Sequence, residues 1–387
     1  MKFKLKRALL ADTINSLVSA IDPKGDVKPV YACALIEVNP PDAPSMSDTV
    51  RITLTDLAVT ARFTIDIDEL KYDPVVDAAH QRFAIPAARL RDVLRASKEE
   101  DATIQFEGKS TVTIKLGRRN NNVEVMLPDA FPVIKFATEF SASMPVRTLL
   151  TAIQATLYAA HADPQQILSS VLISISNDGP STAVALNGSM LSYYEWQESA
   201  SEEALTLLIP AKASKALAGF LDQLSGDEVV QAATGDRHLH FKAGYLEVTA
   251  NKFAGSYPAW NQARLGPEKY ELTIEAGLME LADLLKGICI LGDKRTPAVK
   301  LSIEEGSVTF RAKDLIANSD EELPVTMTGF AAPLSIGLNA AFVQAFLDAA
   351  ARLYKSKTGA VQLRVKEGKA ILLSYGNMTA TIMPCRI

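Results

Sequence analysis

The chain has 387 residues, of which 48% are hydrophobic and 22% charged, and its formal net charge is -5. This length predicts two or three domains, and the proportions exclude disorder along the whole chain. The negative net charge excludes a protein that holds nucleic acid by its overall charge alone. It is compatible with a basic stripe on the surface of an otherwise acidic protein. Apolar stretches break off well before the roughly 20 residues of a membrane helix, and the N-terminus lacks a signal peptide. These features predict a soluble cytoplasmic protein.

The first third of the chain predicts a helix, several strands, a second helix and a strand meander. Strand-like segments CALIEVN and VRITLTDLAVTARFTID follow the first helix. FAIPAARLRDVL (83–94) then reads as a strand that turns into an amphipathic helix at Pro86. The segment ATIQFEGKSTVTIKLGRRNNNVEVMLP alternates apolar and polar residues between turns, which is typical of antiparallel strands. The apolar face of the first helix is expected to consist of Leu10, Ile14, Leu17, Val18 and Ile21.

The same order of predicted elements returns twice. VRTLLTAIQATLYAAHAD and GLMELADLLKGICILGD read as opening helices, and the strand-to-helix phrase recurs at LLIPAKASKALAGFL (207–221) and LSIGLNAAFVQAFL (334–347). Its junctions fall at Pro86, Pro210 and Asn339, which are 124 and 129 residues apart. This is a domain-sized period. It predicts an α+β protein of three tandem similar domains, each with two helices on antiparallel sheets, at residues 1–138, 139–267 and 268–387.

No catalytic or metal site is predicted. Three cysteines stand far apart among apolar neighbours, which indicates buried small hydrophobic residues and no disulfide or zinc site. Among the histidines, only His238 and His240 lie close together, on one strand face without a further ligand, so we expect no metal and no cofactor. GxSxG, GxxxxGK[ST] and GxGxxG motifs are absent. The cysteines are Cys33, Cys289 and Cys385, and the other histidines are His80 and His161.

The order and spacing of several short phrases resemble one family over essentially the whole chain. The phrases are MKFKLKR, LTDLAV, FAIPAARLRDVL, LGRRNNNVEVMLPDAFP, ALNGSML, LLIPAKASKAL, YPAW, IGLNAAFV and the terminal IMPCRI. Together they are similar to the bacterial DNA polymerase III beta subunit, the beta sliding clamp. The resemblance implies a non-catalytic processivity factor that closes as a head-to-tail homodimer into a ring around duplex DNA. Its partners would be DNA polymerase subunits, the clamp loader and other proteins with clamp-binding peptides, in the nucleoid-associated cytoplasm.

Cations recur on the helix that follows each junction. In PAARLRDVLRASK, Arg91, Arg95 and Lys98 are expected on a different helical face from Leu90 and Leu94. Solvated surface charges would give the same pattern. Three equivalent helices with cations in an acidic protein nevertheless favour a DNA-facing lining with non-specific phosphate contacts. The weaker versions are Lys212 and Lys215 in the second repeat and Arg352 and Lys355 in the third.

The apolar terminus IMPCRI is either a final packed strand or, by the resemblance, also one wall of a partner-peptide pocket. Apolar side chains suit such a pocket because a few buried contacts supply most of the affinity. By the resemblance, the first wall comprises Thr381, Ile382, Met383, Pro384, Cys385, Arg386, Asn339 and Phe342. The other wall comprises Leu168, Leu186, Asn187, Gly188, Ser189, Met190, Leu191, Pro258 and Ala263.

The second wall departs from the family pattern. Many members have Thr-Asp-Gly-His-Arg-Leu where this chain has LNGSML (186–191), and Gln262 stands where an arginine is common. We therefore expect a less cationic pocket, whose preferred peptide differs from the usual Gln-x-x-Leu-Phe type.

The resemblance also implies a dimer interface between a first-repeat edge and a third-repeat edge. Val123 and Val125 are expected against Ile290 and Leu291. Opposite charges would set the orientation. These charges are Arg118 and Arg119 on one side and Asp320, Glu321 and Glu322 on the other.

Two alternatives remain. A clamp-like scaffold or secondary paralogue would bind partner peptides without acting as the main ring, and the altered pocket motif favours it. A generic α+β interaction protein would show neither peptide binding nor topological retention on DNA.

Overall fold

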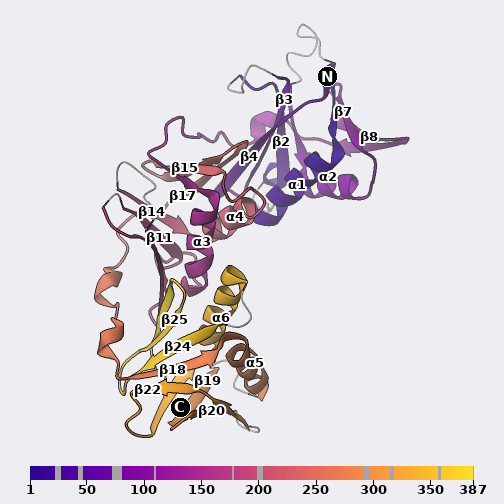
Figure 1. Ribbon diagram of the computed structural model, residues 1–387. Coiled ribbons are helices and arrows are strands. Elements are labelled where there is room, and N and C mark those ends of the chain that lie inside the picture. The colour runs from indigo at the N-terminus through magenta and orange to yellow at the C-terminus, as the bar shows by residue number, and fades with distance from the viewer. Residues whose placement is uncertain are drawn as a thin grey trace. The chain divides into compact units, whose positions relative to one another are not determined.

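A computed structural model describes residues 1–21, 28–41, 47–71, 81–108, 110–176, 178–197, 204–291, 297–313, 318–355 and 359–386. They form two compact units, one of residues 1–147 and 215–252 and the other of residues 148–214 and 253–387 (Figure 1). Each unit consists of helices packed on antiparallel sheets, which confirms the predicted α+β class.

The order of elements recurs three times along the described chain. Each repeat runs strand, helix, four strands, helix, three strands. The short strands β5 (Glu69–Lys71) and β22 (Thr326–Thr328) are additions to this order. The division into three domains at residues 1–138, 139–267 and 268–387 stays a prediction.

The first unit contains two sheets. The smaller has the strand order β5, β1 (Lys2–Lys6), β7 (Asp101–Phe106), β8 (Thr111–Leu116) and β9 (Arg119–Glu124). The larger has the order β10 (Ala142–Pro145), β15 (Val229–Thr234), β16 (His238–Ala243), β17 (Leu246–Asn251), β4 (Val59–Asp66), β3 (Thr49–Thr55), β2 (Cys33–Val38) and β6 (Arg82–Pro86).

The second unit also contains two sheets. The larger has the order β14 (Leu205–Pro210), β11 (Ser170–Ile175), β12 (Ser181–Leu186), β13 (Met190–Trp196), β26 (Met378–Ile382), β25 (Ile371–Tyr375), β24 (Ala360–Val365), β18 (Leu272–Gly277) and β22. The smaller has the order β21 (Asn318–Pro324), β20 (Ser307–Lys313), β19 (Ala298–Glu304) and β23 (Leu334–Asn339).

The helices cover one face of these sheets. In the first unit, α1 (Arg7–Ile21) and α2 (Ala87–Arg95) lie side by side (Figure 1). In the second unit, α5 (Leu278–Ile288) and α6 (Ala340–Tyr354) form the corresponding pair. Helices α3 (Val146–Thr156) and α4 (Ala211–Leu221) each include residues of both units.

The apolar face predicted for the first helix is buried, with one exception. Leu10, Ile14, Leu17 and Ile21 are almost fully buried in α1, whereas Val18 is only half-buried. Strands such as β7 and β8 alternate buried and more exposed residues, as expected of strands with one face on the core. The alternation predicted from the sequence therefore sets which sheet face carries the helices.

The predicted strand-to-helix junctions are confirmed. β6 ends at Pro86, β14 ends at Pro210 and β23 ends at Asn339, and a helix begins at the next residue in each case. The prediction that each repeat begins with a helix was wrong, because β1, β10 and β18 precede the first helices. Each of these short strands is held by a strand distant in sequence: β7, β15 and β24.

Candidate functional site

The predicted pocket residues 186–191 form the turn between β12 and β13. The side-chain oxygen of Asn187 accepts hydrogen bonds from the backbone N-H groups of Ser189 (3.0 Å) and Met190 (2.9 Å). Gly188 has a φ of +92°, a conformation that strongly favours glycine. The Asn-Gly pair thus fixes a tight hairpin turn whose outer residues, Gly188 and Ser189, are exposed.

The last strand of the chain joins this hairpin edge to edge. β13 and β26 pair antiparallel, with Met190 opposite Ile382 and Leu191 opposite Thr381. Beyond β26, the N-H of Met383 donates to the carbonyl oxygen of Ser189 at 2.9 Å. The structure therefore brings the two predicted pocket walls together at this strand pair, with the Met383 side chain 54% exposed beside it.

An apolar cluster lies on the outer face of β11, β12 and β13. Its buried members are Leu172, Val184, Leu191 and Tyr193. Leu186, Leu208, Tyr257 and Trp260 are partly buried and pack against it. Burial raises the pKa of Tyr257 to about 12. The connector between β17 and β18 therefore covers the sheet with aromatic side chains.

The sequence interpretation did not name Tyr257 and Trp260, which pack beside the predicted pocket walls. The signal was present, because two aromatic residues in a proline-containing connector are unusual for a solvated loop. The predicted residues Pro258 and Ala263 lie on the same connector, and both are exposed. Leu168 lies just before β11, half-buried, and accepts a hydrogen bond at its carbonyl oxygen from the N-H of His161.

A charged pair anchors the end of this connector. The Arg264 guanidinium donates to both carboxylate oxygens of Glu195, at 2.7 and 2.9 Å, and lies 4.5 Å from the centroid of the Tyr193 ring. Such a two-point contact is geometrically specific. It holds the connector against β13, beside the apolar cluster.

The other wall is tied down at two further points. The Asn339 side chain caps α6 by accepting a hydrogen bond from the N-H of Ala341 at 2.9 Å. The N-H of Cys385 donates to the carbonyl oxygen of Gly337 at 2.9 Å. Phe342 is half-buried near the start of α6, and Pro384 and Arg386 are exposed. The terminal segment is thus attached both to β23 and to the β12-β13 turn.

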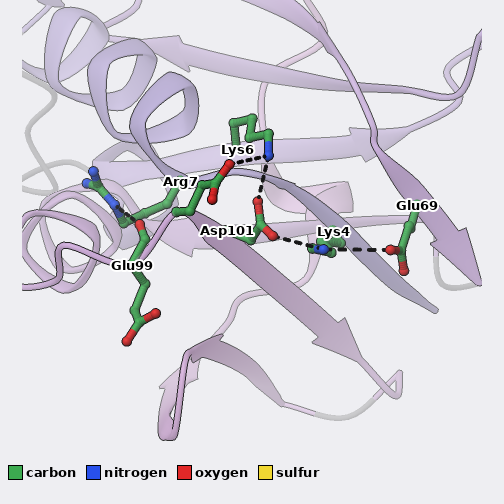
Figure 2. Close-up of polar contacts among 7 residues, drawn as sticks. Lys4, Lys6, Arg7, Glu69, Glu99 and Asp101 are labelled. Atoms are coloured by element: carbon green, nitrogen blue, oxygen red, sulfur yellow. Dashed lines mark hydrogen bonds and ion pairs between the residues drawn. The ribbon is translucent and has the colours of Figure 1, made fainter.

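The predicted cationic helix is shorter than expected. α2 ends at Arg95, so Lys98 lies in the loop beyond it and not on the helical face of Arg91 and Arg95. The Arg7 guanidinium donates to the carbonyl oxygen of Leu94 in the last helical turn (3.3 Å) and to that of Glu99 in the loop beyond it (2.7 Å). Figure 2 shows Arg7 reaching Glu99, so the same side chain holds both the helix end and the loop that carries Lys98.

Other N-terminal cations are held in an ionic network (Figure 2). Asp101 contacts Lys4 at 2.8 Å and Lys6 at 3.1 Å, and these hydrogen bonds lower its pKa. Lys4 also contacts Glu69 at 3.6 Å, and Lys6 contacts Glu100 at 2.9 Å. The basic N-terminal segment therefore neutralises local acids.

The six α-helices that the structure describes are more cationic than the rest of the chain. They carry nine Lys and Arg and five Asp and Glu, a net charge of +4 in a chain of -5. Among the predicted DNA-facing residues, Arg91 is partly buried and pairs with Asp92 at 3.0 Å. Sequence interpretation missed Arg89, which is exposed on α2. The exposed members of the predicted set are Arg95, Lys98, Lys212, Lys215, Arg352 and Lys355.

Two strands lie at the edges of their sheets. β9 is the last strand of the smaller sheet of the first unit, and β21 is the last strand of the smaller sheet of the second. Arg118 and Arg119 are exposed at the start of β9, whereas β21 exposes three acids. These acids are Asp320, Glu321 and Glu322. The two edges therefore carry opposite charge.

The apolar residues predicted at these edges are partly accessible. Val123 and Val125 are half-buried, and Ile290 is 72% exposed in the turn after α5. The side chain of Leu291 lies outside the described residues. The predicted interface residues are therefore at least partly accessible wherever the structure describes their side chains.

The described residues contain no cluster of three or more His, Cys, Asp or Glu that could hold a metal ion. His80 lies outside the described residues. His238 and His240 share a face of β16 with ring centroids 6.1 Å apart, and burial lowers the pKa of His240. All three cysteines are free, but only Cys33 is fully buried; Cys289 and Cys385 are partly exposed, contrary to the prediction.

Within the part of the chain that the structure describes, none of the helices is long and apolar enough to cross a membrane.

Residues 1–135 match the family described as DNA polymerase III beta subunit, N-terminal domain. The chain is 24% identical to a beta sliding clamp of Synechocystis, over 96% of each chain. The fold is similar to a solved DNA polymerase III beta subunit of Thermotoga maritima (TM-score 0.85, 21% identity, 100% of this chain and 99% of that chain). It is also similar to a Pseudomonas aeruginosa sliding clamp bound to griselimycin (TM-score 0.84, 18% identity, 100% of each chain). At these identities the structural likeness shows the fold.

Thr381 provides a test of the geometry on the pocket face. Its hydroxyl is buried without a hydrogen-bond partner among the described residues. A buried unsatisfied hydroxyl costs about 1–3 kcal/mol, so Thr381→Val should raise the thermal unfolding midpoint of the protein. The matched control is Thr156→Val, because the Thr156 hydroxyl is equally buried but donates to the carbonyl oxygen of Ala152 at 2.9 Å. Thr156→Val should lower the unfolding midpoint. If both variants lowered the midpoint equally, the Thr381 hydroxyl would not be unsatisfied as described.

Proposed function

We propose that the chain is a sliding clamp, a non-catalytic processivity factor that encircles duplex DNA and tethers DNA polymerase III. This proposal follows from its membership of the DNA polymerase III beta sliding clamp family. One observation carries the proposal. The described sheets pair the last strand of one repeat with a fixed strand of the preceding repeat: β17 with β4, and β26 with β13.

This pairing rule supports closure as a head-to-tail dimer. The equivalent of β17 and β26 in the first repeat is β9, and the equivalent of β4 and β13 in the third repeat is β21. Both are sheet edges, with exposed backbone groups that invite another strand. β9 of one chain pairing with β21 of a second chain would repeat the same joint twice and close two chains of three domains into a ring.

The charges at the proposed joint favour that pairing. Arg118 and Arg119 would face Asp320, Glu321 and Glu322 of the second chain, which orients the strands more than it strengthens them. Val123, Val125, Ile290 and Leu291 are the proposed apolar contacts of the dimer.

The helices are the proposed DNA-facing elements. Their net charge of +4 in an acidic chain supports weak, non-specific attraction to phosphate. Retention would then come from the closed ring. Arg89 is a proposed phosphate contact, and Arg91 supports the contacts from a partly buried position. The other proposed phosphate contacts are Arg95, Lys98, Lys212, Lys215, Arg352 and Lys355.

Partner proteins would dock their peptides on the pocket between the β12-β13 turn and the terminal segment. Leu186 and Met383 offer apolar surface there, and Tyr257 and Trp260 extend it over the buried Leu191. DNA polymerase subunits and the clamp loader are the proposed partners, in the nucleoid-associated cytoplasm. Ser189, Met190 and Gln262 make this pocket less cationic than in many family members, which favours an apolar peptide.

Topological retention on DNA is the first expected outcome. When loaded by a clamp loader on nicked circular plasmid, the protein should survive a high-salt wash and be released when the circle is cut, because a closed ring slides off a free end. Gel filtration of the bound fraction measures retention. Equal loss from circular and linear DNA in high salt, with the cognate loader present, would instead favour a peptide-binding scaffold.

Charge exchange tests the proposed dimer. A chain with Arg118→Glu and Arg119→Glu should be monomeric, as should a chain with Asp320→Lys, Glu321→Lys and Glu322→Lys, since each places like charges at both joints. Their mixture should form dimers, because every joint then pairs opposite charges. Light scattering gives the masses. A Lys212→Glu, Lys215→Glu chain is the matched control and should remain dimeric; dimers of either edge variant alone would place the interface elsewhere.

Removal of residues 383–387 tests the pocket. A fluorescein-labelled apolar relative of the Gln-x-x-Leu-Phe peptide, selected for binding to the unchanged chain, should lose at least about tenfold in affinity, because a central apolar contact disappears. Met383→Asp should have the same effect. Val229→Asp, at a similarly exposed apolar residue (54% exposed in both cases), is the control and should bind normally. Unchanged anisotropy titrations for the Met383 variant would remove the pocket assignment.

A further inference from the structure

A cavity of about 280 Å³ lies in the first unit, on the outer face of β2, β3 and β4. The connector that follows β9 forms its other side, with Phe131 and Phe136 among the lining residues. Phe131 is buried in a cluster with Val30, Cys33 and Leu35, so this part of the connector is fixed. The cavity is slightly smaller than the roughly 300–1,000 Å³ of sites for drug-sized ligands, so it suits one or two side chains.

The lining is rich in guanidinium groups. Arg51, Arg62 and Arg82 line the cavity, with Glu37 as its single carboxylate. In the strand register Glu37 lies opposite both Arg51 and Arg82, so one carboxylate stands between two guanidinium groups. Lys135 adds an exposed cation on the connector. Guanidinium groups therefore outnumber carboxylates in the lining itself, and the acids that pair with Arg62 and Arg82 stand outside it.

The three arginines are held differently. Arg62 contacts Glu247 at 2.7 Å and lies 3.9 Å from the centroid of the Phe136 ring, which fixes its position. Arg51 is only 5% exposed. Arg82 contacts Asp129 at 2.5 Å, but the side chains are 51% and 79% exposed, so water weakens this pair. Arg82 can accordingly turn to a carboxylate that enters from solvent.

The neighbouring sheet surface is polar as well. Thr53 lines the cavity and is almost fully buried, opposite Arg62 in the register. Thr249 lies two residues beyond Glu247 on the same face of β17, and its buried hydroxyl has no hydrogen-bond partner among the described residues. Buried polar groups of this kind favour a polar occupant.

The same position in the second unit has the opposite character. There the connector covers the strands next to the β13-β26 joint, and the covered face presents Leu172, Val184 and Leu191. In the first unit the connector covers the strands next to the β4-β17 joint, and the face presents Thr53, Arg51 and Glu37. Two equivalent joints thus offer an apolar surface and a cationic one.

We propose that the cavity of the first unit is a second docking site, which binds an acidic peptide segment of a partner protein. A Glu or Asp side chain of that segment would bind the exposed Arg82 in place of Asp129, where charge-assisted hydrogen bonds are strong. An apolar neighbour in the segment would pack on the connector at Val133, which is 96% exposed. The nearby Glu37 disfavours a doubly charged phosphate relative to a singly charged carboxylate.

The test uses the full chain and an array of ten-residue peptides that combine one to three Glu or Asp with apolar residues. Each peptide has a matched version with Gln or Asn at the acidic positions. A subset of acidic peptides should bind, and their amide versions should bind at least about tenfold more weakly. Arg82→Gln should weaken the same subset to a similar extent.

Three controls separate the proposal from other outcomes. Arg147→Gln removes a comparable surface cation, which contacts Asp227 at 3.0 Å in the same unit, and should leave binding unchanged. Met383→Asp should also leave it unchanged, which distinguishes this site from the proposed clamp pocket. Val133→Glu should weaken the acidic peptides by like charge. The proposal is overturned if no peptide depends on both its acid and Arg82, or if inorganic phosphate alone displaces the subset at equal concentration.

Discussion

The pairing of edge strands between repeats is the constraint on which this structure depends. Each repeat on its own would leave the backbone groups of a long strand open at either edge, and such edges bind other strands indiscriminately. Antiparallel pairing of β4 with β17 and of β13 with β26 satisfies them and turns separate small sheets into sheets of eight and nine strands. Among the described strands at these equivalent positions, only β9 and β21 have no partner strand on their outer side. The two strands carry opposite charges, which favours their pairing.

The same joints create the surfaces on which we propose that partners dock. A sheet that continues from one repeat into the next has an outer face with no helix on it, and the connector between repeats must cross that face. In the second unit the connector packs Tyr257 and Trp260 on it and is fastened by the Arg264-Glu195 contact. In the first unit it packs Phe131 and leaves a cavity with arginines. Docking chemistry can therefore vary from joint to joint while the strand pairing, which supports the fold, stays the same.

Much of the fold could be predicted because its signals are local. Pro86, Pro210 and Asn339 mark the strand-to-helix junctions directly, since proline favours the first turn of a helix and Asn caps it. The strands β1, β10 and β18 were missed because short segments become strands only through partners about a hundred residues away.

In the candidate site, too, local features could be predicted and long-range contacts could not. The Asn-Gly turn is a local signal, whereas the meeting of residues 190 and 382 depends on a sheet joint that no local pattern reveals. The end of α2 was also misjudged. Arg7, more than eighty residues earlier in the chain, binds the carbonyl oxygens of Leu94 and Glu99 and holds the loop beyond Arg95, a contact that no local pattern reveals. The resemblance to a family supplied the pocket walls, but not Tyr257 or Trp260, because the cover that these rings provide appears only in the folded chain.

The distribution of charge is consistent with a ring that moves along DNA. A strongly basic lining would release many counterions on binding and would hold the protein in place, with an affinity that falls steeply as salt rises. Here the helices carry a net charge of only +4, interrupted by acids such as Asp12 and Asp348, while the rest of the chain is acidic. In the proposed ring, such weak attraction would centre the duplex without fixing it. Retention would then come from closure, which makes the proposed joint between β9 and β21 decisive for the proposed function.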